Sequence, residues 1–169
     1  GMGGALDSSR FKTYLSLALN KPANDIQGMV IGGHGDTTMI PLVRLASYNG
    51  TPVAQHLSAA QLDKVVADTM VGGATLTKLL GTSAWYAPGA SVAYVVDSII
   101  NDQHRMIPSS VYLEGEYGLT DICIGVPTIL GANGVEAIVD IDLNAQEMEH
   151  LHKSAAAVKT MNAALDNLV

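Results

Sequence analysis

The sequence has little charge and a single cysteine, and each of these two features limits the classes of protein to which it can belong. Charged residues make up 15% of the 169 residues, and the net charge is -7. An acidic chain has no basic surface to neutralise phosphates, so no nucleic acid partner is expected. The lone Cys123 cannot form an internal disulfide, and a reducing compartment, the cytoplasm, is expected.

Long hydrophobic runs are also missing. The stretches SVAYVV (91–96) and ICIGVPTIL (122–130) are far shorter than the roughly 20 residues that a membrane helix needs. No membrane association and no signal peptide are expected. Hydrophobic residues nevertheless reach 48%, too many for a disordered chain. We therefore expect one folded domain over residues 1–169, with some apolar surface turned toward a partner.

Apolar spacing predicts helices in the first half of the chain. From Asp7 to about residue 20 the apolar residues recur at i, i+3, i+4 and i+7, which is one face of a helix. Ser58 and Gln61 form the sequence pattern of a capping box and predict the start of a long helix that continues to Leu80. Gly72-Gly73 lies inside this pattern and predicts a bend or a break.

In the second half of the sequence the spacing of the apolar residues changes from one typical of helices to one typical of strands. After a helix that follows Pro88-Gly89, strands are predicted at 104–118, 121–131 and 135–141, as an antiparallel meander. Shorter strands are predicted earlier, at 26–32 and 39–49. Asn144 and Glu147 predict a second capping box, opening a C-terminal helix whose apolar stripe reaches Leu165. This order of elements indicates an α+β fold.

The stretch IGGHGDTTM (31–39) places one histidine between glycines, directly after an apolar run. A dinucleotide-binding loop needs G-x-G-x-x-G, and counted from Gly33 the third glycine would fall at Thr38, so the pattern fails. A metal site has no support either, because no CxxC pair is present. His150 and His152 are two residues apart on a predicted helix and point in different directions. No metal is expected.

Acid–base chemistry is the remaining interpretation. Flanking glycines let a turn bring His34 into an open cleft, and a buried carboxylate on its other ring nitrogen raises its pKa and fixes its tautomer. Asp7 is the candidate carboxylate. Arg10 follows one helical turn later and can bind a substrate carboxylate with two parallel hydrogen bonds. Together they predict a site for a 2-oxo acid. Taken singly, Asp7 is typical of a helix N-cap, Arg10 of a solvated helix charge and His34 of a structural turn.

These residues, with further stretches, resemble the lactate/malate dehydrogenase family. The motifs are GGALDSSRF (3–11) and GGHGD (32–36), followed in order by WYAPGASV, LEGEYG, IGVPTILGANGVEAI and KSAAAVKTMNAAL. The resemblance runs along the whole chain and matches the C-terminal domain of the NAD-dependent enzymes. It implies an antiparallel sheet packed against long helices.

The resemblance also implies roles for single residues. In the family the aspartate of LDSxRF pairs with the histidine of HGD, which implies that His34 exchanges the substrate proton and that Asp7 supports it. The arginine of the first motif, here Arg10, binds the substrate carboxylate. Ala84 stands where the lactate enzymes usually have threonine, which leaves room for a second carboxylate and favours malate. Pro88 falls where the family packs an apolar residue near the nicotinamide, although both residues also suit the start of a helix.

The family's N-terminal, NAD-binding Rossmann half has no counterpart in this sequence. Residues 1–169 are therefore expected to be the substrate-binding and catalytic domain alone, acting with NAD in a homo-oligomer and inactive by themselves. No cofactor contact is assigned to Thr37–Met39, because this stretch is one residue longer than the family pattern. Three alternatives stay open: a lactate or other 2-hydroxy acid dehydrogenase, a non-catalytic assembly module, and a hydrolase using Ser8 or Ser9, which lacks the G-x-S-x-G elbow.

Overall fold

The computed structural model describes residues 1–164. Its helices are α1 (Gly3–Leu19), α2 (Ala59–Leu80), α3 (Tyr86–Ile100) and α4 (Ala145–Ala163). Its strands are β1 (Ile26–Gln27), β2 (Val30–Gly32), β3 (Met39–Pro41), β4 (Ser47–Tyr48), β5 (Thr51–Pro52), β6 (Arg105–Glu114), β7 (Thr120–Gly131) and β8 (Gly134–Ile138). The predicted position Leu165 lies outside the described residues.

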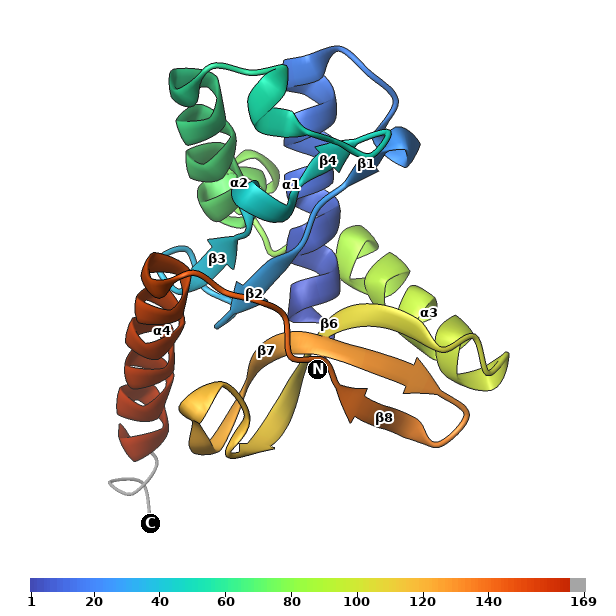
Figure 1. The fold of residues 1–169 in the computed structure, drawn as a ribbon, viewed down its shortest axis with the longest axis vertical. Coiled ribbons are helices and arrows are strands. Elements are labelled where there is room, and N and C mark those ends of the chain that lie inside the picture. Colours follow the sequence, from blue (N-terminus) through green and yellow to red (C-terminus); the bar gives the residue numbers. More distant parts are fainter. Residues whose placement is uncertain (165–169) are drawn as a thin grey trace.

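The main sheet is built around β7. Strand β6 pairs with β7 along its whole length, and β8 pairs with the other edge of β7, so the predicted antiparallel meander is confirmed. Strand β2 joins the same edge at Gly32 and Gly125 and carries β3 beside it, while β1, β4 and β5 form a separate small sheet. The α+β fold, an antiparallel sheet packed against long helices, is therefore confirmed (Figure 1).

The earlier strands differ from their prediction. The run 26–32 is two strands that belong to different sheets, because the chain turns after Gln27 close against the ring of Phe11. The run 39–49 is likewise divided, by a short 3-10 helix over Val43–Leu45. These corrections leave β2 as the strand that ends directly before His34.

The helix boundaries also correct the prediction at three places. Helix α1 begins at Gly3 with Met2 as its N-cap, so Asp7 lies inside the helix and is no N-cap. Helix α2 is one continuous helix through Gly72-Gly73, so of the two outcomes predicted there, a bend or a break, the break into two helices is not found. Helix α3 begins two residues before Pro88, which lies in its first turn, where proline is tolerated. Both predicted capping boxes are confirmed.

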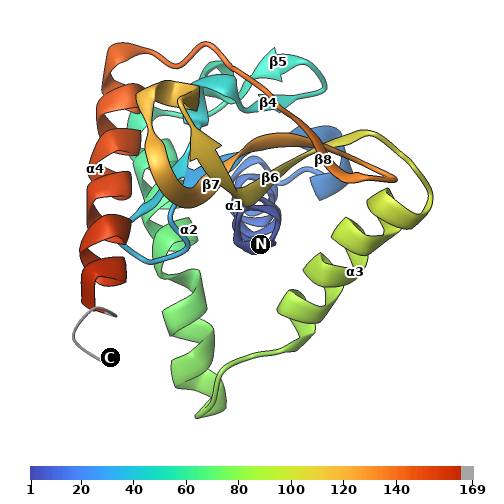
Figure 2. The ribbon, with the colours of Figure 1, turned by 90° about the horizontal axis from the view of Figure 1, so that it is seen from below.

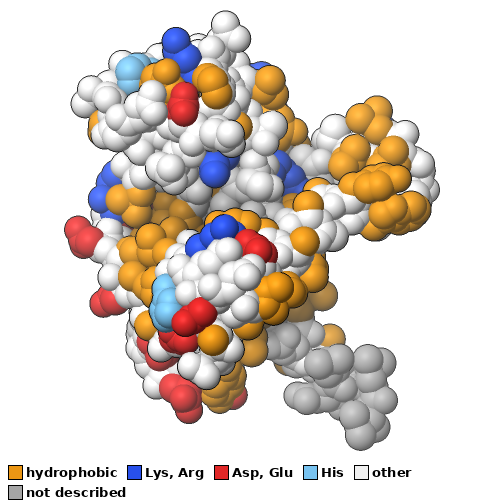
Figure 3. All heavy atoms as spheres, turned by 90° about the vertical axis from the view of Figure 1, so that its right-hand side faces the viewer, with side chains coloured by type: hydrophobic (Ala, Val, Ile, Leu, Met, Phe, Trp, Pro, Cys, Tyr) orange, Lys and Arg blue, Asp and Glu red, His pale blue; other side chains and the backbone are white. Residues whose placement is uncertain are grey.

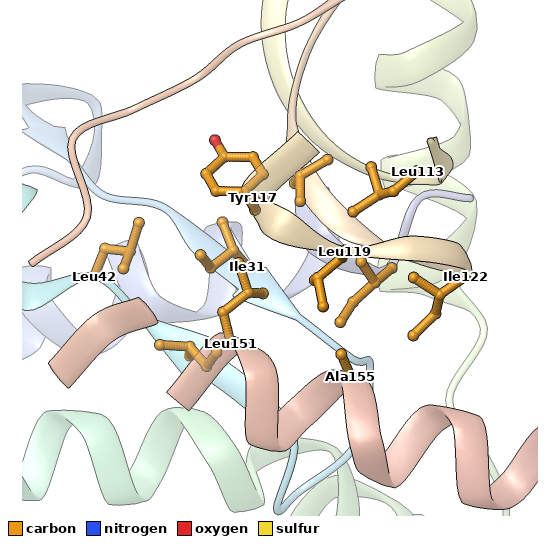
Figure 4. Close-up of a cluster of buried hydrophobic side chains, with 11 residues drawn as sticks. Ile31, Leu42, Leu113, Tyr117, Leu119, Ile122, Leu151 and Ala155 are labelled. Carbon is orange, nitrogen blue, oxygen red and sulfur yellow. The ribbon is translucent and has the colours of Figure 1, made fainter. Parts of the chain in front are cut away.

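The core forms where the helices cover the sheet. Helix α1 runs through the middle of the molecule and packs against α2, α3, β2 and β6 (Figure 1). Helix α4 covers β2 and β7, and Figure 4 shows Leu151 and Ala155 of this helix facing Ile31 and Ile122 of those strands. Burying a side chain such as Leu151 contributes about 1.5–3 kcal/mol. The strand that ends at His34 is thus held from both faces.

One part of the molecule is apolar and exposed. The end of α2 and the start of α3 project from the body, and Figure 3 shows hydrophobic side chains gathered on this projection (Figures 2 and 3). We call residues 76–86 the α2–α3 lobe; its exposed apolar side chains are Leu76, Leu79, Leu80, Trp85 and Tyr86. Within residues 1–164, no helix is long and apolar enough to cross a membrane.

Candidate active site

Three of the predicted residues converge at one point. Asp7 and Arg10 come from the same face of α1, and His34 comes from the loop after β2. The carboxylate of Asp7 uses one oxygen for each partner: Oδ2 lies 2.6 Å from Nδ1 of His34, and Oδ1 accepts from Nη1 of Arg10 at 3.1 Å. The spacing of residues 7 and 10 on one helix brings Asp7 and Arg10 together, and the tertiary fold brings His34 to them.

Asp7 and His34 differ sharply in how far they are buried. Asp7 is only 1% exposed, whereas the side chain of His34 is 55% exposed. A buried carboxylate is stable when it is paired and hydrogen-bonded, and Asp7 has two cationic partners. Because Nδ1 of His34 faces Asp7, its Nε2 is left as the ring nitrogen for a ligand.

The loop geometry explains why glycines surround His34. Gly32 has a φ of +88°, a conformation that residues with a side chain rarely adopt, and it turns the chain out of β2. Gly3 lies against the imidazole so closely that a Cβ there would be 2.8 Å from Cγ of His34. The loop then closes with hydrogen bonds from the amides of Thr38 and Met39 to the carbonyl of Gly35.

Ser154 is a contributor that the sequence did not suggest. Its hydroxyl on α4 accepts from the amide of Gly33 at 2.9 Å and donates to the carbonyl of Thr38 at 2.7 Å, so it ties both ends of the His34 loop to the helix. The residue is buried. The available signal was a serine on the apolar face of the predicted C-terminal helix, one turn after Leu151.

The surroundings raise the pKa of His34 above its ordinary value of 6.5. The hydrogen bond to Asp7 is the largest cause, and the negative charges of Asp7 and Asp36 act in the same direction. Desolvation and the positive charge of Arg10 oppose it. The protonated imidazole therefore persists to higher pH than that of an ordinary histidine, as suits a proton donor.

Replacing Asp7 with Asn removes the negative charge that stabilises the protonated His34 ring. We expect the pKa of His34 to fall in Asp7→Asn, because desolvation and Arg10 then act against the charged ring. NMR titration of the histidine ring protons measures this in the chain itself, with the exposed His150 as an internal reference. An unchanged His34 titration would contradict the pairing.

The other predicted site residues lie elsewhere. Ala84 is on the α2–α3 connection and Pro88 in the first turn of α3, both partly buried. Within residues 1–164, the hydrogen bonds of the three converging side chains do not reach them. Ser8 accepts from the amide of Val30 and Ser9 donates to a carbonyl of its own helix, so neither hydroxyl is paired with His34, as a nucleophile would be.

A second histidine lies between acids, on the far side of the fold. His104 faces Asp102 with Nδ1 at 3.5 Å and Glu136 with Nε2 at 2.9 Å. One oxygen or nitrogen atom from each of the three residues lies within 4.8 Å of the others, but all three are exposed and each carboxylate faces a different ring nitrogen. This arrangement is an exposed ion-pair bridge between the α3–β6 turn and β8.

Comparison with known proteins agrees with the geometry. The sequence model of the lactate/malate dehydrogenase family, alpha/beta C-terminal domain, matches residues 4–167. The chain belongs to this family. It is 74% identical over all 169 residues to the malate dehydrogenase of Flavobacterium johnsoniae, and 69% identical over 165 residues to that of Parabacteroides distasonis. The chain spans about half the length of these curated relatives, 54% and 53% respectively.

Solved structures of the family have the same fold. Malate dehydrogenase from Salinibacter ruber superposes with a TM-score of 0.94 at 42% identity, over 98% of this chain and 54% of that one. Lactate dehydrogenase from Cryptosporidium parvum, solved with lactic acid and nicotinamide adenine dinucleotide, superposes with a TM-score of 0.94 at 35% identity, over 99% of this chain and 54% of that one. The predicted family and fold are therefore confirmed.

Proposed function

We propose that residues 1–169 are the substrate-binding and catalytic half of an NAD-dependent malate dehydrogenase, which interconverts malate and oxaloacetate. The observation that carries this proposal is the shared carboxylate of Asp7, which holds a proton-donating imidazole and a carboxylate-binding guanidinium side by side. Curated relatives at 74% and 69% identity, all named malate dehydrogenase, support the same conclusion.

His34 exchanges the proton in this reaction. When bound, NAD supplies or accepts the hydride at the substrate carbon. In the direction of reduction, the protonated His34 donates from Nε2 to the carbonyl oxygen, and Asp7 stabilises the charged ring and fixes its tautomer. In the direction of oxidation, the neutral ring takes the proton from the hydroxyl. The raised pKa keeps the donor form available to higher pH than an ordinary histidine would.

Arg10 binds the carboxylate next to the reacting carbon. One of its terminal nitrogens donates to Asp7, and its side chain is 19% exposed, so the guanidinium is held in place while part of it faces solvent. A planar guanidinium grips a carboxylate with two parallel hydrogen bonds, which orients the carbonyl toward His34.

Substrate choice is assigned to the α2–α3 connection and the first turn of α3. Ala84 leaves room for the second carboxylate of malate or oxaloacetate, and Pro88 packs near the nicotinamide. The exposed apolar residues beside them suit a flat apolar ring, whereas the sequence has no glycine-rich loop for the cofactor phosphates. This chain therefore holds only the nicotinamide end, and a further NAD-binding domain holds the rest.

The α2–α3 lobe supports the proposal that a separate NAD-binding domain packs against this chain. Its side chains Leu79 and Tyr86 are 78% and 83% exposed, which is unusual for large apolar residues on a free surface. We assign the lobe to the contact with the NAD-binding domain. The apolar outer side of α3, with Val92, Val96 and Ile100 exposed, is assigned to a subunit contact in a homo-oligomer.

A chimera tests the proposal. In it, this chain replaces the matching 54% of the Flavobacterium johnsoniae enzyme, and NADH oxidation is followed with oxaloacetate and with pyruvate. We expect turnover with oxaloacetate in preference to pyruvate, and negligible turnover by residues 1–169 alone, because the substrate and cofactor contacts assigned to the NAD-binding domain are then missing. Preference for pyruvate would identify a lactate-type enzyme. Rates from the isolated chain that match the chimera would contradict the division into two halves.

A further inference from the structure

Helix α2 presents two glycines to the side chain of Arg10. The buried face of α2 runs through Val65 and Thr69, and the next positions on that face are Gly72 and Gly73. At this level the helix has no side chain to pack against α1. The space is taken by the stem and guanidinium of Arg10.

The two glycines differ in how closely Arg10 approaches them. A Cβ on Gly72 would lie 2.6 Å from Cδ and 3.0 Å from Nε of Arg10, which is a steric overlap. A Cβ on Gly73 would lie 3.3 Å from Nη2, which is only a tight contact. Arg10 is therefore held between the backbone of α2 on one side and the carboxylate of Asp7 on the other.

We propose that Gly72 is a positioning residue for substrate binding: its missing side chain sets the place of the Arg10 guanidinium. This inference rests on the proposed role of Arg10 as the anchor of the substrate carboxylate. Within a helix, glycine is unfavourable compared with alanine, so its presence has no benefit for α2 itself. The contact with Arg10 supplies the benefit.

A purely structural role makes a different prediction. If Gly72 served only the packing of α1 on α2, a methyl group there would lower the stability of the fold. The two nearest atoms that the methyl would meet belong to the long, flexible side chain of Arg10, however, and the third is the terminal hydroxyl of Tyr14 at 3.3 Å. Arg10 can move aside without moving the backbone. The stability is then kept, and the cost falls on the orientation of the guanidinium.

The experiment uses the chimera described above with Gly72→Ala. We expect the KM for oxaloacetate to rise roughly 10- to 100-fold, the size of effect that follows a misplaced anchor, with a smaller change in kcat. The Tm should stay the same or rise, because alanine favours the helix. Gly73→Ala is the matched control, with the same added atom at 3.3 Å instead of 2.6 Å, and we expect a clearly smaller rise in KM.

A double-mutant cycle with Arg10→Gln completes the test. If Gly72 acts through Arg10, Gly72→Ala adds nothing once Arg10 is replaced. An unchanged KM in Gly72→Ala, a drop in Tm with the loss of activity, or an equal further loss in the Arg10→Gln background would each overturn the inference. If Arg10→Gln itself leaves the KM unchanged, the proposed function falls as well, so the two failures are distinguishable.

Discussion

Replacing His34 with Asn in the chimera is expected to lower kcat by roughly 100- to 10,000-fold, the range that a positioned general acid contributes. Asparagine can still form a hydrogen bond to the substrate oxygen, but it cannot transfer a proton. The KM should change much less than kcat, because the proposed anchor of the carboxylate, Arg10, is unchanged. The measurement is steady-state turnover with oxaloacetate over a range of pH.

The pH profile gives this variant a second readout. The reductive rate of the parent chimera should fall as the pH rises through the raised pKa of His34, because the donor form is lost there. In His34→Asn this limb should disappear. His150→Asn, which removes an exposed histidine of α4, is the control and should keep the parent rate and profile. Full turnover in His34→Asn would instead favour the non-catalytic assembly module.

Arg10→Gln is the second large effect. Removing one partner of a desolvated, hydrogen-bonded ion pair costs about 2–5 kcal/mol, which corresponds to a loss of roughly 30- to 4,000-fold in kcat/KM. Most of the loss should appear in KM for oxaloacetate, because the guanidinium binds the carboxylate in the ground state as well as in the transition state. Steady-state kinetics of the chimera measure the split.

A conservative variant separates the effect of the charge of Arg10 from that of its planar shape, and a variant at another arginine serves as the control. Arg10→Lys keeps the charge but loses the planar fork, so its loss should be intermediate. Arg44→Gln is the control, since Arg44 forms an exposed ion pair with Glu147 far from His34. In Arg10→Gln the pKa of His34 should rise further, because the positive charge of Arg10 lowers it. A kcat/KM equal to that of the parent would contradict the proposed anchor.

The sequence predicted local elements better than their boundaries. Both capping boxes were recognised because their side chains and backbone partners are three residues apart. The start of α1 was missed, because it depends on Gly3 packing against His34, which is distant in sequence. The run 26–32 was read as one strand, since apolar spacing does not show that a chain leaves one sheet for another.

What the sequence alone determined is the family of the chain and the residues of the candidate site: an acid and an arginine one helical turn apart, and a histidine between glycines. What only the tertiary structure decided is how these groups are held. The pairing of buried Asp7 with His34, the anchoring of the loop by Ser154 and the seat of Arg10 on Gly72 are contacts between residues 27 to 121 positions apart in the sequence. Such contacts leave no spacing rule in the sequence, because they depend on how helices and strands pack.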